Sequence, residues 1–292
     1  MECFEIKGLK KSYKEKEVLK GIDLSVYPYE IYAVLGRNGC GKTTLFKCIM
    51  GLIEESEGSC LFNGKKVDFE SRTHFGYMPE RRSLLPDLTL KEHLQLLGVL
   101  KKMSEADIEQ RILKLSEDFE LTDYLEKRIN SLSKGQQQKT QLMIALLNEP
   151  ELLILDEPLS GLDIDSVDFF LNSLKKYASL GHAILISSHQ MEFMDALCTH
   201  VLLLSEGHVV QKGSLKEIQD QSGISLKINA SAHYEPLLKL SDRLEMQGAY
   251  VNFYVKDKLK AKKLLTKAHQ CEGLTQLKLS PLSVAELLKE HT

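Results

Sequence analysis

The feature that most constrains this chain is a glycine-rich segment that follows a short apolar run. Residues 31–35 read IYAVL, and residues 36–44 read GRNGCGKTT, which fits the pattern G-x-x-x-x-G-K-[ST]. Backbone N–H groups of such a turn can surround the phosphates of a nucleoside triphosphate. The helix expected to start near Lys42 points the positive end of its dipole at the same phosphates. The segment therefore predicts a nucleoside triphosphate site between a buried strand and a helix.

Two side chains of this segment have separate expected roles. Lys42 should reach the β- and γ-phosphates, and the Thr43 hydroxyl should ligate Mg²⁺. The alternative is a glycine-rich turn that carries a lysine by chance, which the preceding strand and the following helix disfavour. We assign the other residues of the loop to the same nucleotide: Gly36, Arg37, Asn38, Gly39, Cys40, Gly41 and Thr44.

The thiol of Cys40 lies inside this loop, next to Gly41 and Lys42. A helix N-terminus and a nearby lysine both lower the pKa of a thiol and make it more reactive. We therefore expect a maleimide to inactivate the protein through Cys40 and bound nucleotide to protect it. A buried, inert thiol is the alternative.

A second informative segment combines an apolar run with two adjacent acids. Residues 152–157 read LLILDE, which is typical of a fully buried parallel strand whose carboxyl end lies where doubly wound sheets place ligands. Asp156 would hold Mg²⁺ through water, and Glu157 would face the water that attacks the γ-phosphate. A strand that happens to end in two exposed acids is the alternative, and the upstream glycine-rich loop makes it less favourable.

Residues 132–136 lie between these two elements and read LSKGQ. They resemble the signature of the ATP-binding cassette (ABC) family, usually LSGGQ, with Lys134 in place of the first glycine. Ser133, the N–H of Gly135 and Gln136 would form a second anion site at a helix N-terminus. The resemblance implies that this site holds the γ-phosphate of an ATP bound to a second subunit. An ordinary helix cap is the alternative.

Other elements of the family can be matched residue by residue. Tyr13 matches the aromatic residue on which adenine stacks, although a tyrosine there could also pack on a small antiparallel sheet. Residues 160–163 read SGLD and match the D-loop at the dimer interface. His189 follows the apolar run 183–186 and matches the switch histidine that contacts the γ-phosphate. A polar cap after a strand is the alternative for His189.

One position departs from the family pattern. The family usually has glutamine after the strand that leads into its helical part, whereas residues 75–79 (FGYMP) are followed here by Glu80. Glutamine offers a neutral oxygen and an amide donor, while an ionised glutamate offers charged oxygens and no donor. We assign Glu80 to the nucleotide and the metal, with a solvent-exposed loop acid as the alternative. In having a glutamate at this position, the chain resembles a subgroup of ABC exporters.

The resemblance implies an α/β fold: a P-loop ABC ATPase core with a mostly parallel sheet, an antiparallel β-subdomain and an inserted helical subdomain at about 80–148. We expect this ATPase domain to span residues 1–220. Residues 221–292 are expected to form a small accessory α/β domain, with strands at 224–229, 249–255 and 274–279 and helices at 233–246, 257–270 and 283–290. Its expected task is dimerisation, regulation or contact with a membrane partner.

Composition sets the remaining bounds. The chain has 292 residues and a formal net charge of −3, which argues against a dedicated nucleic-acid partner. No apolar run is long enough to span a bilayer, and the N-terminal residues MECFE lack the features of a secretion signal. The six cysteines show neither paired metal spacing nor a disulfide framework. We expect a cytoplasmic protein, peripheral on the cytoplasmic face of the cell membrane.

These observations lead to one functional hypothesis with one alternative. We expect an ATP-hydrolysing, Mg²⁺-dependent subunit of an ABC transporter, similar to the ATPases of ABC-2-type exporters. It would act as a homodimer, or as a heterodimer with a second ABC subunit, and drive a separate transmembrane permease. The alternative is a soluble ABC-type ATPase that acts on a macromolecular partner without a permease. The transported substrate cannot be inferred, because the permease would form the path.

Overall fold

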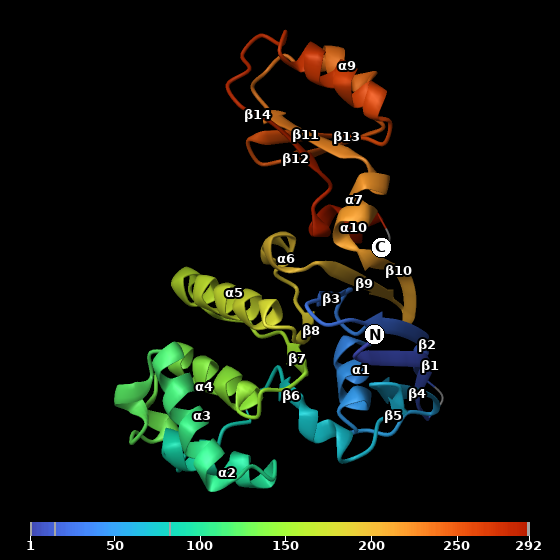
Figure 1. Cartoon of the computed structure of the whole chain (residues 1–292). Coiled ribbons are helices and arrows are strands. Elements are labelled where there is room, and N and C mark those ends of the chain that lie inside the picture. The colour runs from blue at the N-terminus through green and yellow to red at the C-terminus, as the bar shows by residue number, and fades with distance from the viewer. Residues whose placement is uncertain (1, 15, 82, 291–292) are drawn as a thin grey trace. The chain divides into compact units, whose positions relative to one another are not determined.

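A computed structural model describes residues 2–14, 16–81 and 83–290 (Figure 1). The chain divides into two compact units, one ending at Lys212 and the other beginning at Gly213. The division falls before the expected boundary at residue 220, because helix α7 (Leu215–Ser222) belongs to the second unit. The sequence showed a composition change after this helix, whereas the compact unit begins before it.

A six-stranded, mostly parallel sheet forms the centre of the first unit, in the order β10-β9-β3-β8-β7-β6. Strand β3 pairs in parallel with β8 and β9, and β7 pairs in parallel with β6 and β8. Every residue of β3, β7 and β8 is buried, as expected for apolar strands covered on both faces. The bounds are β3 (Ile31–Leu35), β6 (Phe75–Met78), β7 (Leu152–Asp156), β8 (Ala183–Ser187), β9 (His200–Ser205) and β10 (His208–Ser214).

An antiparallel sheet, in the order β2-β1-β4-β5, packs beside the parallel sheet. Phe75 of β6 makes edge-to-face contacts with Phe4 and Phe62 of this sheet, at centroid distances of 5.8 and 5.1 Å. These aromatic contacts join the two sheets through one core. The bounds are β1 (Phe4–Tyr13), β2 (Lys16–Val26), β4 (Glu57–Phe62) and β5 (Lys65–Lys66), and the helices of the core are α1 (Lys42–Ile49), α5 (Ile164–Ser179) and α6 (Met191–Leu197).

Three helices form the inserted helical subdomain, shown in green in Figure 1: α2 (Leu90–Leu100), α3 (Glu105–Asp118) and α4 (Lys134–Leu146). Each begins at a hydroxyl side chain that accepts a hydrogen bond from the first turn, namely Thr89, Ser104 and Ser133. Short 3₁₀ turns at η2 (Thr122–Tyr124) and η3 (Ile129–Ser131) join α3 to α4, and η1 (Ser71–His74) precedes β6. No helix in the described part of the chain is both long and apolar enough to cross a membrane.

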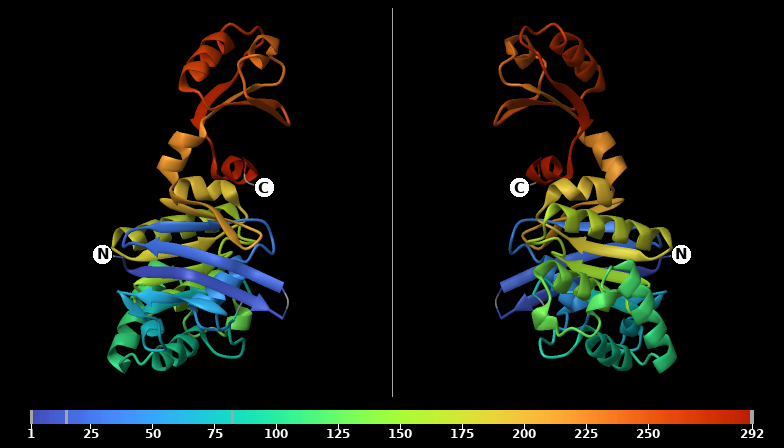
Figure 2. Two further views of the ribbon diagram at one scale, coloured as in Figure 1. Left: turned by 90° about the vertical axis from the view of Figure 1, so that its right-hand side faces the viewer. Right: turned by 90° about the vertical axis from the view of Figure 1, so that its left-hand side faces the viewer.

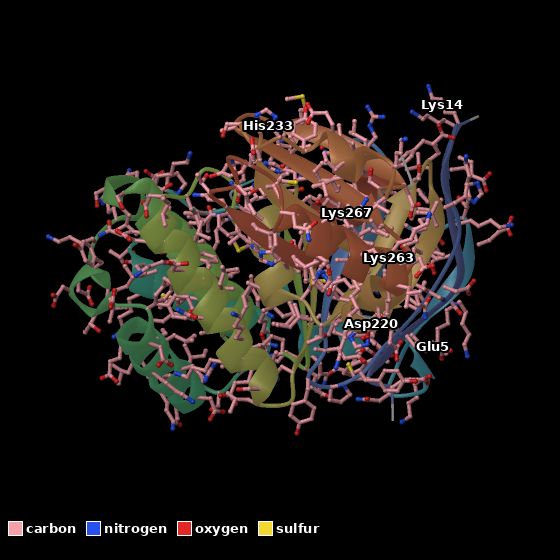
Figure 3. All side chains as sticks on the ribbon, turned by 90° about the horizontal axis from the view of Figure 1, so that it is seen from above. Glu5, Lys14, Asp220, His233, Lys263 and Lys267 are labelled. Carbon is pink, nitrogen blue, oxygen red and sulfur yellow. The ribbon has the colours of Figure 1, made fainter. Side chains whose placement is uncertain are left out.

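The second unit is a four-stranded antiparallel sheet in the order β12-β13-β11-β14. Helix α9 packs its Ala261 and Leu264 against one face of this sheet and exposes Lys263 and Lys267 (Figures 2 and 3). The element order β-α-β-β-α-β is that of a split βαβ motif. The bounds are β11 (Ile224–Asn229), α8 (Glu235–Leu238), β12 (Arg243–Gln247), β13 (Tyr250–Val255), α9 (Lys258–Ala268), β14 (Leu277–Pro281) and α10 (Val284–Glu290).

The expected α/β fold class is confirmed, but one expected element is wrong. The helix expected at 233–246 is a single short helix, α8, followed by strand β12. In β12 the apolar Leu244 and Met246 alternate with polar residues, and the strand pairs with β13 along its whole length. Alternation with period two is the strand pattern, and it lies within a segment whose leucines also fit a helix.

Candidate active site

The glycine-rich loop runs from Gly36 to Gly41 and joins β3 to helix α1. Gly41 is the N-cap of α1 and adopts a left-handed conformation with φ of 117°. A Cβ atom at Gly41 would lie 2.8 Å from Leu19 Cδ2, and one at Gly36 would lie 2.4 Å from the carbonyl oxygen of Leu204. Glycine is therefore required at both ends of the loop for its backbone to pass this close to its neighbours.

Lys42 is buried at the start of α1, with 7% of its surface exposed. Its ammonium group donates to the carbonyl oxygens of Gly36, at 2.8 Å, and Arg37, at 3.4 Å. Both acceptors are neutral, so these contacts orient the ammonium group without neutralising its charge. Because a buried cation is costly without an anionic partner, this geometry favours an anion such as a phosphate in the loop.

Two acids lie at the carboxyl end of β7, and Ser187 of the neighbouring strand β8 connects them. Ser187 Oγ donates to Asp156 Oδ1 at 2.7 Å and accepts from the backbone N–H of Glu157 at 3.0 Å. Asp156 is 1% exposed, and its Oδ2 has no hydrogen-bond partner among the described residues. A buried carboxylate oxygen with unused acceptor capacity is available to a cation or a water molecule.

Glu157 directs its carboxylate toward His189. Glu157 Oε2 accepts from the backbone N–H of His189 at 3.0 Å and lies 2.7 Å from His189 Nδ1. The Glu157 side chain is only 11% exposed, whereas that of His189 is 56% exposed. Glu157 also has a φ of 52°, an unusual backbone conformation for a residue with a side chain. Such strain is often found at functional sites.

These elements enclose a cavity of about 460 Å³ above the loop. It combines one cation, two acids, a histidine and the hydroxyls of two threonines. A cavity of this size can hold a small-molecule ligand. Its lining residues are Val18, Asn38, Gly39, Gly41, Lys42, Thr43, Thr44, Glu80, Glu157 and His189.

Several expected site residues do not line this cavity. Tyr13 ends strand β1 with 46% of its surface exposed, and Lys11 Nζ lies 5.2 Å from its ring centroid. Ser133 caps α4 in a capping box: its Oγ accepts from the N–H of Gln136 at 3.2 Å, and its own N–H donates to Gln136 Oε1 at 2.9 Å. The other expected residues outside the lining are Gly36, Arg37, Cys40, Gly135, Gln136 and the buried Asp156.

The structure disfavours the expected reactivity of Cys40. The thiol is buried, and burial raises its pKa above the usual value despite the opposing influence of Lys42. Desolvation of the thiolate outweighs the nearby positive charge. The alternative of a buried, inert thiol is the one that the structure favours.

Sequence reasoning missed two residues of this site. Ser187 bridges Asp156 and Glu157, and Val18 lines the cavity from strand β2. A polar residue at the carboxyl end of a buried apolar strand was a usable signal for Ser187, because parallel strands end at the same edge of the sheet. No sequence signal points to Val18.

Known proteins are similar to this chain in both sequence and fold. Residues 19–160 match the family model described as ABC transporter. An ABC transporter ATP-binding protein of Bacillus subtilis is 38% identical over 229 residues, which cover 78% of this chain and 76% of that protein. This chain belongs to the ATP-binding subunits of ABC transporters.

Further similarities support the same assignment. The Nod factor export ATP-binding protein I of Cupriavidus metallidurans is 31% identical over 261 residues, covering 87% of this chain and 86% of that protein. A solved ATP-binding subunit of an ABC transporter is 35% identical, with a TM-score of 0.70, and the match covers 75% of this chain and 92% of that structure. This ABC subunit is therefore an ATP-binding protein and an ATPase.

Proposed function

We propose that this ABC subunit hydrolyses MgATP in the phosphate-loop cavity and passes the resulting motion to a separate transmembrane permease. The observation that carries this proposal is the meeting of Lys42 with Glu157 and His189 at one edge of the parallel sheet. Phosphoryl transfer needs a cation for the phosphates and a group that positions the nucleophile. The cavity offers both.

The residues around the cavity fit a magnesium ion. Mg²⁺ prefers hard oxygen ligands, and it would neutralise charge on the phosphates during hydrolysis. Thr43 and Glu80 line the cavity, and Asp156, which precedes the lining residue Glu157, has a buried carboxylate oxygen with no partner among the described residues. We assign the metal to Thr43 directly, to Asp156 through water and to Glu80.

The nucleotide is held mainly by the loop. Its phosphates take the place of the neutral carbonyls as partners of Lys42, and the backbone of the loop supplies N–H donors. Tyr13 stacks on the adenine. We assign the rest of the loop, Gly36, Arg37, Asn38, Gly39, Cys40, Gly41 and Thr44, to the same contacts.

Glu157 and His189 carry out the chemistry. Both contacts of His189 use Glu157 Oε2, so Oε1 remains available to the attacking water. Glu157 would orient that water and accept its proton, as a general base, while the water oxygen approaches the γ-phosphate. His189 would hold Glu157 in place and contact the γ-phosphate.

The signature residues act on a second subunit. Ser133, Gly135 and Gln136 stand at the N-terminus of α4, outside the cavity of their own chain. Two such subunits, identical or different, would place each signature over the ATP of the other. Closure around two ATP molecules and separation after hydrolysis then provide the motion.

A groove beside β6 suits the permease. It has a volume of about 240 Å³, and its apolar lining includes Phe69 and Leu100, which are 76% and 67% exposed. Lys101 also lines it, and burial lowers the pKa of this lysine to about 8. Exposed apolar residues around a concave surface are typical of a protein contact. Strand β6 contributes to this groove, and Glu80, which follows β6 in the sequence, lines the ATP cavity. A partner in this groove would therefore contact a segment that leads directly to the nucleotide site.

We further propose that the transporter is an exporter. A relative that matches this chain over 86% of its own length is named for the export of Nod factor. A glutamate at position 80 is also similar to the pattern of exporter ATPases. The protein would lie on the cytoplasmic face of the membrane. A soluble ABC ATPase that acts on a macromolecule is the alternative, and the same groove would then hold a soluble partner.

Purification of the complex from its own cells tests this proposal. The tagged chain, extracted in mild detergent, should retain a multispanning membrane protein that stimulates its ATPase activity. Leu100→Asp in the groove should lose this protein while keeping basal ATP hydrolysis. Leu113→Asp is the matched control, because Leu113 is 55% exposed on α3 and lies outside the groove. Recovery of a soluble protein in place of a membrane protein would favour the alternative.

A further inference from the structure

A second cavity, of about 310 Å³, lies between α3 of the helical subdomain and α5 of the core. The described residues that line it all differ from those of the phosphate-loop cavity. Phe119, the C-cap of α3, makes an edge-to-face contact with Phe169 of α5 at 5.3 Å, so the two walls meet at one end. The volume lies at the lower end of the range for small-molecule sites.

The interior of this cavity is apolar and aromatic. Leu115, Phe119 and Leu146 are each less than 5% exposed. Tyr177 donates its hydroxyl to the carbonyl oxygen of Pro150 at 2.7 Å, so the polar end of this ring is already satisfied. His182 stacks on Tyr177 at 4.0 Å, and burial lowers its pKa and favours the uncharged ring. These apolar and aromatic side chains therefore suit an apolar or aromatic group.

Charged residues stand around the cavity, and positive charge exceeds negative charge. Arg111 and Lys114 both pair with the carboxylate of Glu149, and Lys114 Nζ lies 3.9 Å from Glu149 Oε1. Lys176 forms its own pair with Asp118 at 3.1 Å. Three cations therefore face two carboxylates, and the 61% exposed Lys114 is the one left with the weakest partner. This arrangement suits a single negative charge on a bound molecule.

We propose that this cavity binds a small amphipathic monoanion, with an aromatic or short aliphatic body between α3 and α5 and its anionic group beside Lys114. The proposal goes beyond ATP hydrolysis, because the site lies apart from the nucleotide cavity. An occupant touches both the helical subdomain and the core. It would therefore fix the spacing of these two parts.

The probe for this site is anilinonaphthalene sulfonate, an aromatic monoanion whose fluorescence rises in apolar surroundings. It is added to the full chain with labelled leucine methyl groups. The methyl resonances of Leu115, in the α3 wall, and Leu180, the C-cap of α5, should shift together as the probe binds. Ser173→Phe, which fills the cavity from α5, should abolish both shifts while ATP binding remains.

A charge-reversal pair tests the anionic group even if the filled variant fails to fold. Lys114→Glu should weaken probe binding by about fivefold. Lys175→Glu is the matched control, because Lys175 is exposed on α5 but does not line the cavity. Equal affinities for the two variants would overturn the assignment of the anionic group. Shifts confined to Leu100 in the groove, with Leu115 and Leu180 unchanged, would overturn the site itself.

Discussion

At the scale of single residues, Glu80 is the clearest departure from the family pattern. Its side chain stands at the cavity, where the family usually has a glutamine. Glu80→Gln should keep substantial ATPase activity, because an amide can supply both an oxygen and a donor. Glu80→Ala should lower kcat by about tenfold and affect ATP affinity less, because water positioning is lost. Measured kcat and KM values like those of the wild type in both variants would make Glu80 an ordinary surface acid.

Two residues show what a sequence can and cannot predict at this scale. The motif at Lys42 has a fixed spacing, so its place at the loop could be predicted from the sequence alone. The reactivity of Cys40 depends on the balance between burial and the charge of Lys42. Both influences act on the same thiol, and the sequence does not give the depth of burial. Only the packing of the loop against its neighbours decides the outcome.

At the scale of single elements, the capping box at the start of α4 has two possible roles, helix stability and nucleotide contact, and a comparison of variants can separate them. Ser133→Ala should cost about 1 kcal/mol of stability and also abolish ATP-driven association of two subunits. Thr89→Ala is the matched control, because Thr89 forms the same capping box with Glu92 at the start of α2. It should cost a similar stability but leave association unchanged. Denaturation midpoints and size-exclusion chromatography with ATP compare the two, and equal association would show that Ser133 is only a cap.

Prediction of elements succeeded where one pattern fitted a segment and failed where two patterns fitted. Strand β7 is a continuous apolar run that ends in acids, and it lies where the sequence indicated. The segment 233–246 contains leucines at helical spacing, but Arg243–Gln247 alternate and pair with β13. Pairing with a distant strand decided this conformation. The contact of Ser187 with Asp156 likewise depends on the register of β7 and β8.

At the scale of the whole molecule, the residues assigned to ATP all precede residue 190. A chain that ends after Ser214, the last residue of β10, should therefore fold and bind ATP. Its first unit keeps its own core, which includes no residue of the second unit. Calorimetric titration with ATP, together with a melting curve, measures both properties. Loss of ATP binding in a cooperatively melting truncated chain would show that the second unit contributes to the nucleotide site.

We propose that two subunits close around ATP and reopen only after Glu157 supports hydrolysis. The most direct measurement is size-exclusion chromatography of Glu157→Gln with MgATP, alongside the rate of phosphate release. Turnover should fall by a factor on the order of 10² or more, and a stable ATP-dependent dimer should appear. Lys42→Ala should bind nucleotide weakly and form no such dimer. Near-normal turnover of Glu157→Gln, with no dimer, would contradict both the role of Glu157 and the ATP-driven closure of two subunits.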